Sequence, residues 1–111
     1  MSKDLPTFFG IIVEPGFDYR ALVLEELSIT NAIIDPKAEQ NQSARLFLKV
    51  DKKKIPLCYL DLQRTSNPLS IHITRGTDLL LNVVGNCSIH VTGFYEPKSI
   101  SVPPMFVMAE E

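Results

Sequence analysis

Cysteine and histidine come closest to a metal-binding pattern at Cys87 and His90, which are three residues apart. The run from Ile89 to Thr92 alternates apolar and polar residues, and this alternation indicates a β-strand. An odd separation on a strand directs two side chains to opposite faces of the sheet. A tetrahedral site also needs further ligands, and no second pair with this spacing occurs in the chain. We therefore expect a small buried cysteine, a solvent-facing histidine and no metal.

Two histidines and two aspartates, His72, His90, Asp61 and Asp78, are the other candidates for catalysis. No nucleophile is placed beside them by any spacing, and the GxSxG, HExxH and Walker A motifs are lacking. The five glycines are scattered and form no phosphate-binding loop. Histidines on the polar face of a strand are usually solvated or hydrogen-bonded. The sequence therefore predicts a protein with no enzymatic activity and no cofactor.

Basic side chains are concentrated in the middle of the chain, although the net charge is −2. Residues 45–75 carry seven basic and two acidic side chains, whereas the segments on either side are net acidic. Five of these cations form the candidate basic patch: Arg45, Lys49, Lys52, Lys53 and Lys54. They indicate either a solvated strand and turn or a patch for an anionic partner, such as the protein's own acidic tail. The net acidity of the whole chain argues against direct binding of nucleic acid.

The composition is that of one folded domain. The 111 residues are 45% hydrophobic and 22% charged, which is ordinary for a globular protein. Two cysteines are too few for a disulfide scaffold, so we expect a reducing compartment. No apolar run approaches the length of a membrane span, and the first ten residues lack the apolar core of a secretory signal.

Short runs rich in β-branched and aromatic residues, separated by prolines and glycines, predict an all-β fold. The eight predicted strands are Phe8–Val13, Tyr19–Leu24, Leu27–Ile34, Ala44–Asp51, Lys54–Leu62, Leu69–Ile73, Asp78–Val84 and Cys87–Phe94. A short helix over Ala21–Leu27 is the competing interpretation, but the run that follows it favours a strand. We expect an N-terminal extension at residues 1–7, a β core at 8–97 and a Pro-rich, partly disordered tail at 98–111. Within that tail, the apolar cluster 105–108 is either strapped onto the body or docked on a partner.

Several predicted strands are apolar on both faces, whereas a lone β-sandwich buries only one face of each sheet. The second face needs a cover, and a neighbouring subunit is the simplest one. The sequence therefore predicts a homo-oligomer, with a pentamer as the first choice and a tetramer as the second. The residues expected at the seam are Ile55, Leu57, Leu60, Leu62, Leu79, Leu80 and Leu81.

Two stretches, Phe8–Gly16 and Gly85–Tyr95, carry a resemblance to a known family, the nucleoplasmin family of histone chaperones. Phe8–Gly16, followed by Tyr19, looks like the family's opening strand, in which two aromatic residues and a glycine precede a turn. Gly85–Tyr95 is similar to its closing strand, where a glycine turn leads into alternating apolar residues and a second glycine. Leu27–Ile33 and Tyr59–Leu62 fall where the family has matching strands, so the resemblance spans Phe8 to Pro97. The form looks closest to the domains that precede the isomerase domain of nuclear FKBP-type peptidyl-prolyl isomerases.

The resemblance implies an eight-stranded jelly-roll sandwich, a ring-shaped homopentamer, and a location in the nucleus or nucleolus. It also implies binding of core histones through acidic segments. Here the candidate histone contacts are few: Asp35, Glu39, Glu110 and Glu111. Because so few carboxylates attract histones only weakly, we expect most histone binding to come from acidic segments beyond Glu111.

The alternative interpretation is a generic jelly-roll module that binds a peptide or a carbohydrate on a sheet face. A carbohydrate site would favour exposed tryptophan or tyrosine. The chain has no tryptophan and three tyrosines, which makes the carbohydrate ligand the weaker choice.

Overall fold

The computed structural model describes residues 7–96, and this part of the chain forms eight β-strands and no helix. The strands are β1 (Thr7–Val13), β2 (Asp18–Leu22), β3 (Leu27–Ile34), β4 (Ser43–Val50), β5 (Lys53–Asp61), β6 (Ser66–Ile73), β7 (Asp78–Gly85) and β8 (Ile89–Tyr95). The helix considered over Ala21–Leu27 does not form, because β2 continues to Leu22 and the Val23 side chain enters the core. The predicted extension at 1–7 and tail at 98–111 lie outside the described residues, apart from Thr7, which begins β1.

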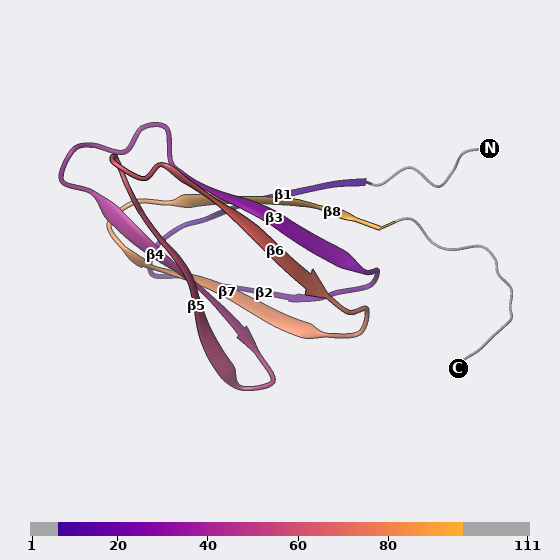
Figure 1. Ribbon diagram of the computed structural model, residues 1–111. Helices are drawn as coiled ribbons and strands as arrows, with labels where there is room; N and C mark the ends of the chain where they lie inside the picture. Colours follow the sequence, from indigo (N-terminus) through magenta and orange to yellow (C-terminus); the bar gives the residue numbers. More distant parts are fainter. Residues whose placement is uncertain (1–6, 97–111) are drawn as a thin grey trace, which may run out of the picture.

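The strands form two four-stranded antiparallel sheets that pack face to face (Figure 1). Sheet A has the order β1-β8-β3-β6, and sheet B has the order β2-β7-β4-β5. Consecutive strands alternate between the sheets except at the β4–β5 hairpin, and this connectivity is that of a jelly roll. The predicted eight-stranded jelly-roll sandwich is therefore confirmed.

The core lies between the sheets and is built from alternate residues of each strand. Leu46 and Leu48 of β4 are buried, whereas Arg45 and Lys49 on the same strand are exposed. No polar or charged residue is buried in the described part of the chain. Stability therefore rests on an apolar core made mostly of valine, leucine and isoleucine.

Glycine makes two of the close approaches that the fold requires. A Cβ on Gly93 would lie 2.0 Å from the Ser28 carbonyl oxygen, beside the bulge of β3. Gly85 has a φ of +150°, and a Cβ there would lie 2.3 Å from the Ser43 carbonyl oxygen. Only a residue without a side chain fits at these two positions without displacing the neighbouring backbone.

The connections divide between two ends of the sandwich. One end holds the β4–β5 hairpin turn, the β2–β3 and β6–β7 loops, and residues 7 and 96, where the described chain begins and stops (Figure 1). The other end holds the β1–β2 turn, the long β3–β4 loop and the β7–β8 turn. We call the first the terminal end and the second the loop end.

Candidate assembly and binding surfaces

The cysteines and His90 do not converge on a site. Cys87 is buried and Cys58 is partly buried, and burial raises the pKa of both thiols, which keeps them protonated. His90 occupies an outward position of β8, between the buried Ile89 and Val91. Within residues 7–96, no group of three or more His, Cys, Asp or Glu side chains could hold a metal ion. No helix in this range is long and apolar enough to cross a membrane.

His72 lies between two glutamates at the terminal end of sheet A. Its Nε2 is 2.6 Å from Glu26 Oε1, and its Nδ1 is 3.6 Å from Glu96 Oε2. The Arg75 backbone N–H donates to the second Glu26 oxygen at 3.0 Å, and the Ser28 hydroxyl donates to Glu96 Oε2 at 3.2 Å. This cluster joins the loop before β3 to the ends of β6 and β8.

The pKa of Glu26 lies below its ordinary value, chiefly because the Arg75 N–H donates to the carboxylate. Partial burial opposes this shift, and His72 adds to it through a hydrogen bond and its charge. Both ring nitrogens of His72 lie beside carboxylates, and the Ser28 hydroxyl donates to one of them. These contacts tie three segments of the chain together, which is the role of a structural clasp.

The aspartates that the sequence offered as histidine partners lie elsewhere. Asp78 pairs with Arg20 at 3.4 Å, and Asp61 accepts the backbone N–H groups of Gln63 and Arg64 at 2.9 Å. Sequence analysis missed the glutamates that contact His72. Predicting the contact with Glu26 requires the register of β3 and β6, in which Ser28 lies opposite His72 and Glu26 just precedes β3.

The structure separates the seven residues expected at the subunit seam. Leu60, Leu79 and Leu81 point into the sandwich and are at most 4% exposed, so they belong to the core of the subunit itself. Leu80 faces outward from β7, where Arg20 and Lys49 lie on the neighbouring strands in the same row. Leu80 therefore has a charged residue on each side, and the centres of subunit interfaces are usually depleted of charge.

The other three seam candidates follow edge strand β5 and its end. Ile55 and Leu62 are 44% and 43% exposed, and Leu57 is partly buried at the bulge of β5. We call Ile55, Leu57 and Leu62 the β5 edge patch. Together with the outward-facing Leu80, this patch is the part of the predicted seam that lies outside the buried core.

A second apolar surface lies on the outer face of sheet A. The strand Phe8–Val13 is one of those predicted to be apolar on both faces, but none of its residues was expected at the seam. Phe8 and Ile12 of β1 are 74% and 51% exposed, and Ile33 of β3 is exposed in the same row as Ile12. We call Phe8, Ile12 and Ile33 the sheet A patch. Because β1 and β5 are edge strands at opposite sides of the sandwich, the two patches face different directions.

The basic patch divides into two parts. Lys49, Lys52, Lys53 and Lys54 lie together around the β4–β5 hairpin, which projects from the lower part of the molecule in Figure 1. We call these four residues the lysine hairpin. Arg45 lies toward the loop end, with its guanidinium 5.4 Å from the centroid of the Tyr59 ring.

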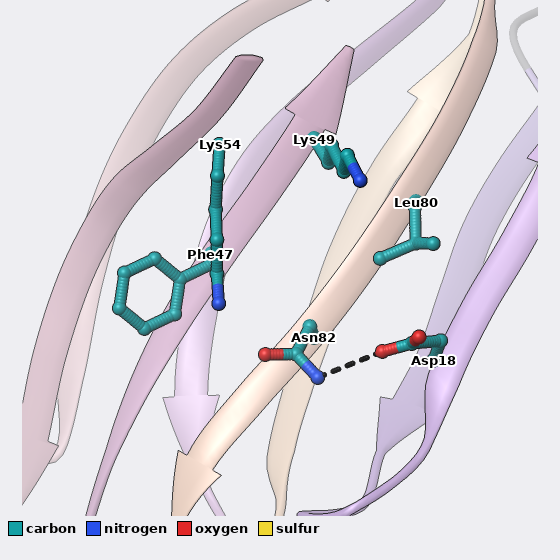
Figure 2. A pocket seen from close by; sticks show the side chains of 6 residues that line it. All are labelled: Asp18, Phe47, Lys49, Lys54, Leu80 and Asn82. Atoms are coloured by element: carbon teal, nitrogen blue, oxygen red, sulfur yellow. Dashed lines mark hydrogen bonds between the residues drawn. The ribbon is translucent and has the colours of Figure 1, made fainter. Parts of the chain in front are cut away.

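Two hollows lie on the outer face of sheet B beside the lysine hairpin. The first has a volume of about 140 Å³ and is lined by Asp18, Phe47, Lys49, Lys54, Leu80 and Asn82. Figure 2 shows these side chains converging from β2, β7, β4 and β5, with the Asn82 amide donating to Asp18 at 2.9 Å. The second hollow, of about 390 Å³, lies around Arg20, Lys52 and Asp78, and shares Lys49 and Leu80 with the first.

The acidic residues proposed to contact histones lie away from the lysine hairpin. Asp35 and Glu39 are in the β3–β4 loop at the loop end. The Asp35 carboxylate is engaged locally, because it accepts the Lys37 backbone N–H at 3.0 Å, whereas Glu39 is exposed. Glu110 and Glu111 lie outside the described residues.

Known proteins share this fold. The nucleoplasmin-like N-terminal domain of Drosophila FKBP39 matches with a TM-score of 0.80 and 16% identity, over 92% of this chain and all of that one. The Drosophila NLP core, whose structure was described for its pentamer formation and histone binding, matches with a TM-score of 0.70 and 14% identity. That match covers 79% of this chain and 96% of the other. At these identities, the matches show the fold alone.

Sequence relatives cover the same part of the chain. A 46 kDa FK506-binding nuclear protein of Spodoptera frugiperda is 27% identical over 82% of this chain, and FK506-binding protein 4 of Rhizopus delemar is 30% identical over 79%. The chain spans only 22% and 23% of the lengths of these relatives. The family model of the nucleoplasmin-like domain matches residues 8–96, which is nearly the whole described range and carries no catalytic assignment. The chain therefore belongs to the nucleoplasmin-like domain family.

Proposed function

We propose that this chain is the oligomerising, non-enzymatic core of a nuclear histone chaperone. Membership of the nucleoplasmin-like family supports the proposal, as does the pentamer formation and histone binding attributed to the Drosophila NLP core. A nuclear location is supported by the nuclear FK506-binding relative. The proposed partners are further copies of the chain, as a pentamer first and a tetramer second, and core histones.

The observation that carries the assembly is the pair of apolar patches on different sides of the subunit. Large side chains such as Phe8, at 74% exposure, have no cover within residues 7–96. Contact between the sheet A patch of one subunit and the β5 edge patch of the next would be head-to-tail. Such contacts close into a ring when the rotation between subunits divides a full turn evenly.

Light scattering tests the assembly. The wild-type chain, with a subunit mass of 12.5 kDa, is expected to show a mass of four or five subunits at micromolar concentration. Ile12→Asp places a carboxylate in the sheet A patch without entering the core, so it should give a folded monomer. Ser70→Asp, at an exposed outward position of β6, is the matched control and should keep the wild-type mass. A monomeric wild type, or an Ile12→Asp variant that stays assembled, would overturn the proposed contact.

Histone binding is proposed to depend on acidic segments outside the described core, with the ring supplying multivalency. Within residues 7–96, the exposed Glu39 is a single carboxylate in the β3–β4 loop, and the lysine hairpin repels basic proteins. Exposed charge pairs are individually weak and are screened by salt, so only many carboxylates acting together bind strongly.

The corresponding experiment titrates core histones against the chain with and without an added C-terminal glutamate tract, at two salt concentrations. The ring with tracts should bind more tightly than the unmodified chain and more tightly than the free glutamate peptide, because linkage raises the effective concentration. The histone affinity of the Ile12→Asp variant with the tract should fall to that of the free glutamate peptide. Equal and salt-independent histone affinity with and without the tract would show instead that the folded surface performs the recognition.

A further inference from the structure

The lysine hairpin concentrates positive charge, and none of its lysines forms an ion pair within residues 7–96. Within residues 7–96, the ion pairs are Arg20 with Asp78 and His72 with its two glutamates, and no lysine has a carboxylate within 4.0 Å. Lys49 and Lys54 are also directly opposite each other in the β4–β5 ladder. Like charges in that position disfavour the pairing, so the strands hold the two cations together despite their repulsion.

The turn of the hairpin carries a second local cost. Asp51 and Lys52 have φ values of 54° and 68°, in the left-handed region that favours glycine. A two-residue hairpin loop of this conformation is most often Asn-Gly or Asp-Gly. A lysine in the second position therefore adds a charge at the tip at the expense of turn stability. Outliers of this kind are concentrated at binding sites.

Apolar side chains lie directly beside these cations. Phe47 and Leu80 are the two apolar side chains that line the smaller hollow, and Lys49 lines it with them (Figure 2). The Lys54 ammonium lies 4.6 Å from the centroid of the Phe47 ring. A volume of about 140 Å³ is enough for one apolar side chain. Lys49 and Leu80 line both hollows, so an extended segment that crosses from one to the other would pass these two residues.

We propose that the outer face of sheet B at the lysine hairpin binds an acidic peptide segment of a partner protein, in which an apolar residue is flanked by carboxylates. The apolar side chain would occupy the hollow over Phe47 and Leu80. Its neighbouring carboxylates would meet Lys49, Lys52 and Lys54. Lysine ammonium groups are compact charges that suit carboxylates on a flexible segment.

The arrangement fits a peptide better than a nucleic acid. Asp18 lines the smaller hollow and Asp51 and Asp78 line the larger one, so a ligand with a charge on every unit is disfavoured, whereas a peptide can place an uncharged residue there. A peptide can instead place its charges over the lysines and a backbone N–H near Asp18.

This inference goes beyond the proposed function, because histones are basic and the lysine hairpin repels them. The surface lies apart from the sheet A patch, and it adjoins the β5 edge patch only where Lys54 precedes Ile55, so light scattering is needed to show that assembly is unchanged. A test without histones therefore leaves the histone proposal untouched when it fails.

Fluorescence anisotropy with a labelled synthetic peptide tests the site on the whole chain. The probe is a dodecapeptide of glutamates with one central leucine; its controls carry glutamine for glutamate, or glycine for the leucine. The glutamate–leucine peptide should bind best, and its affinity should fall as salt rises. The double variant Lys49→Glu, Lys54→Glu should weaken binding about tenfold, and the neutral pair Lys49→Gln, Lys54→Gln should weaken it less. Lys37→Glu, at the loop end, is the matched control and should bind like the wild type.

The circular dichroism spectrum and the mass from light scattering should be unchanged for every variant. If charge reversal disturbs the fold, the neutral variant Lys49→Gln, Lys54→Gln still tests the site. Equal binding of the glutamate and glutamine peptides would overturn the proposal, as would equal weakening by Lys37→Glu. Tighter binding of a single-stranded oligonucleotide of the same charge would assign the surface to nucleic acid and also overturn it.

Discussion

At the scale of single residues, the tightest constraint in the fold is at Gly93. Its Cα faces the bulge of β3, and the Ser28 carbonyl oxygen occupies the space that a Cβ would need. The bulge shifts the register between Ile29 and Asn31, so the backbone of β3 crowds β8 at this point. The family resemblance included this glycine, and the geometry supplies its physical reason.

Gly93→Ala should lower the free energy of unfolding by about 3 kcal/mol, because the methyl group can fit only if backbone atoms move. Urea denaturation followed by circular dichroism measures the change. Gly10→Ala is the matched control: there the nearest atoms belong to the exposed Phe8 ring, which can rotate away. Equal losses in the two variants would contradict this account of Gly93.

Glu26 makes stability depend on pH at the acidic end. Its folded-state pKa lies below the ordinary value of 4.5. Its ionised form therefore contributes stability above pH 4.5, and this contribution is lost as the pH falls through the folded-state pKa. Glu26→Gln should be less stable than the wild type at neutral pH, and the difference should disappear in strong acid. Urea midpoints measured across this range test the sign, and a difference that grows on acidification would contradict it.

At the scale of elements, the two edge strands on one side of the sandwich each contain a proline. Pro68 lies within β6 and Pro56 lies at the bulge of β5. A proline lacks the N–H that a central strand needs, so it is tolerated at an edge. Pro68 also explains why the sequence predicted β6 only from Leu69: three residues of the strand precede the apolar alternation.

Lys52→Gly in the β4–β5 turn should raise the free energy of unfolding by about 1 kcal/mol, because glycine adopts positive φ without strain. Lys53→Gly removes the same charge from the first residue of β5 and should instead lower stability by about 0.5 kcal/mol. Thermal unfolding distinguishes the two. Stabilisation by both substitutions would indicate that charge repulsion, rather than turn conformation, dominates at the hairpin.

The sequence predicts which residues of a strand alternate between the two faces of the sheet. It does not predict which strand lies beside it, or in which register. The period-two pattern correctly separated Leu46 and Leu48 from Arg45 and Lys49. The run Leu79–Leu81 has no such alternation, because all three residues are leucine. Its outward-facing residue, Leu80, is known only from the structure. Contacts between residues distant in sequence, such as His72 with Glu26, depend on strand register and bulges that no local pattern encodes.

At the scale of the whole molecule, core and surface positions separate folding from assembly. Leu60 is fully buried, so Leu60→Asp should cost about 4 kcal/mol or more by placing a carboxylate in the apolar core. The expected result is loss of the β-sheet circular dichroism signal, with loss of assembly as its consequence. Ile12→Asp should keep that signal. If Leu60→Asp gave a folded monomer, Leu60 would belong to the subunit interface rather than to the core.

The pairing of Thr7 with Tyr95 has a mechanical consequence. β1 and β8 are adjacent antiparallel strands, so the described chain enters and leaves at the same end of sheet A. A pulling force applied through both ends would load the β1–β8 hydrogen bonds one after another, as in opening a zipper, rather than all together in shear. The domain should therefore yield at low force, beginning with the detachment of β1. Because β1 carries Phe8 and Ile12, tension along the chain would remove the sheet A patch before it disturbed the rest of the sandwich.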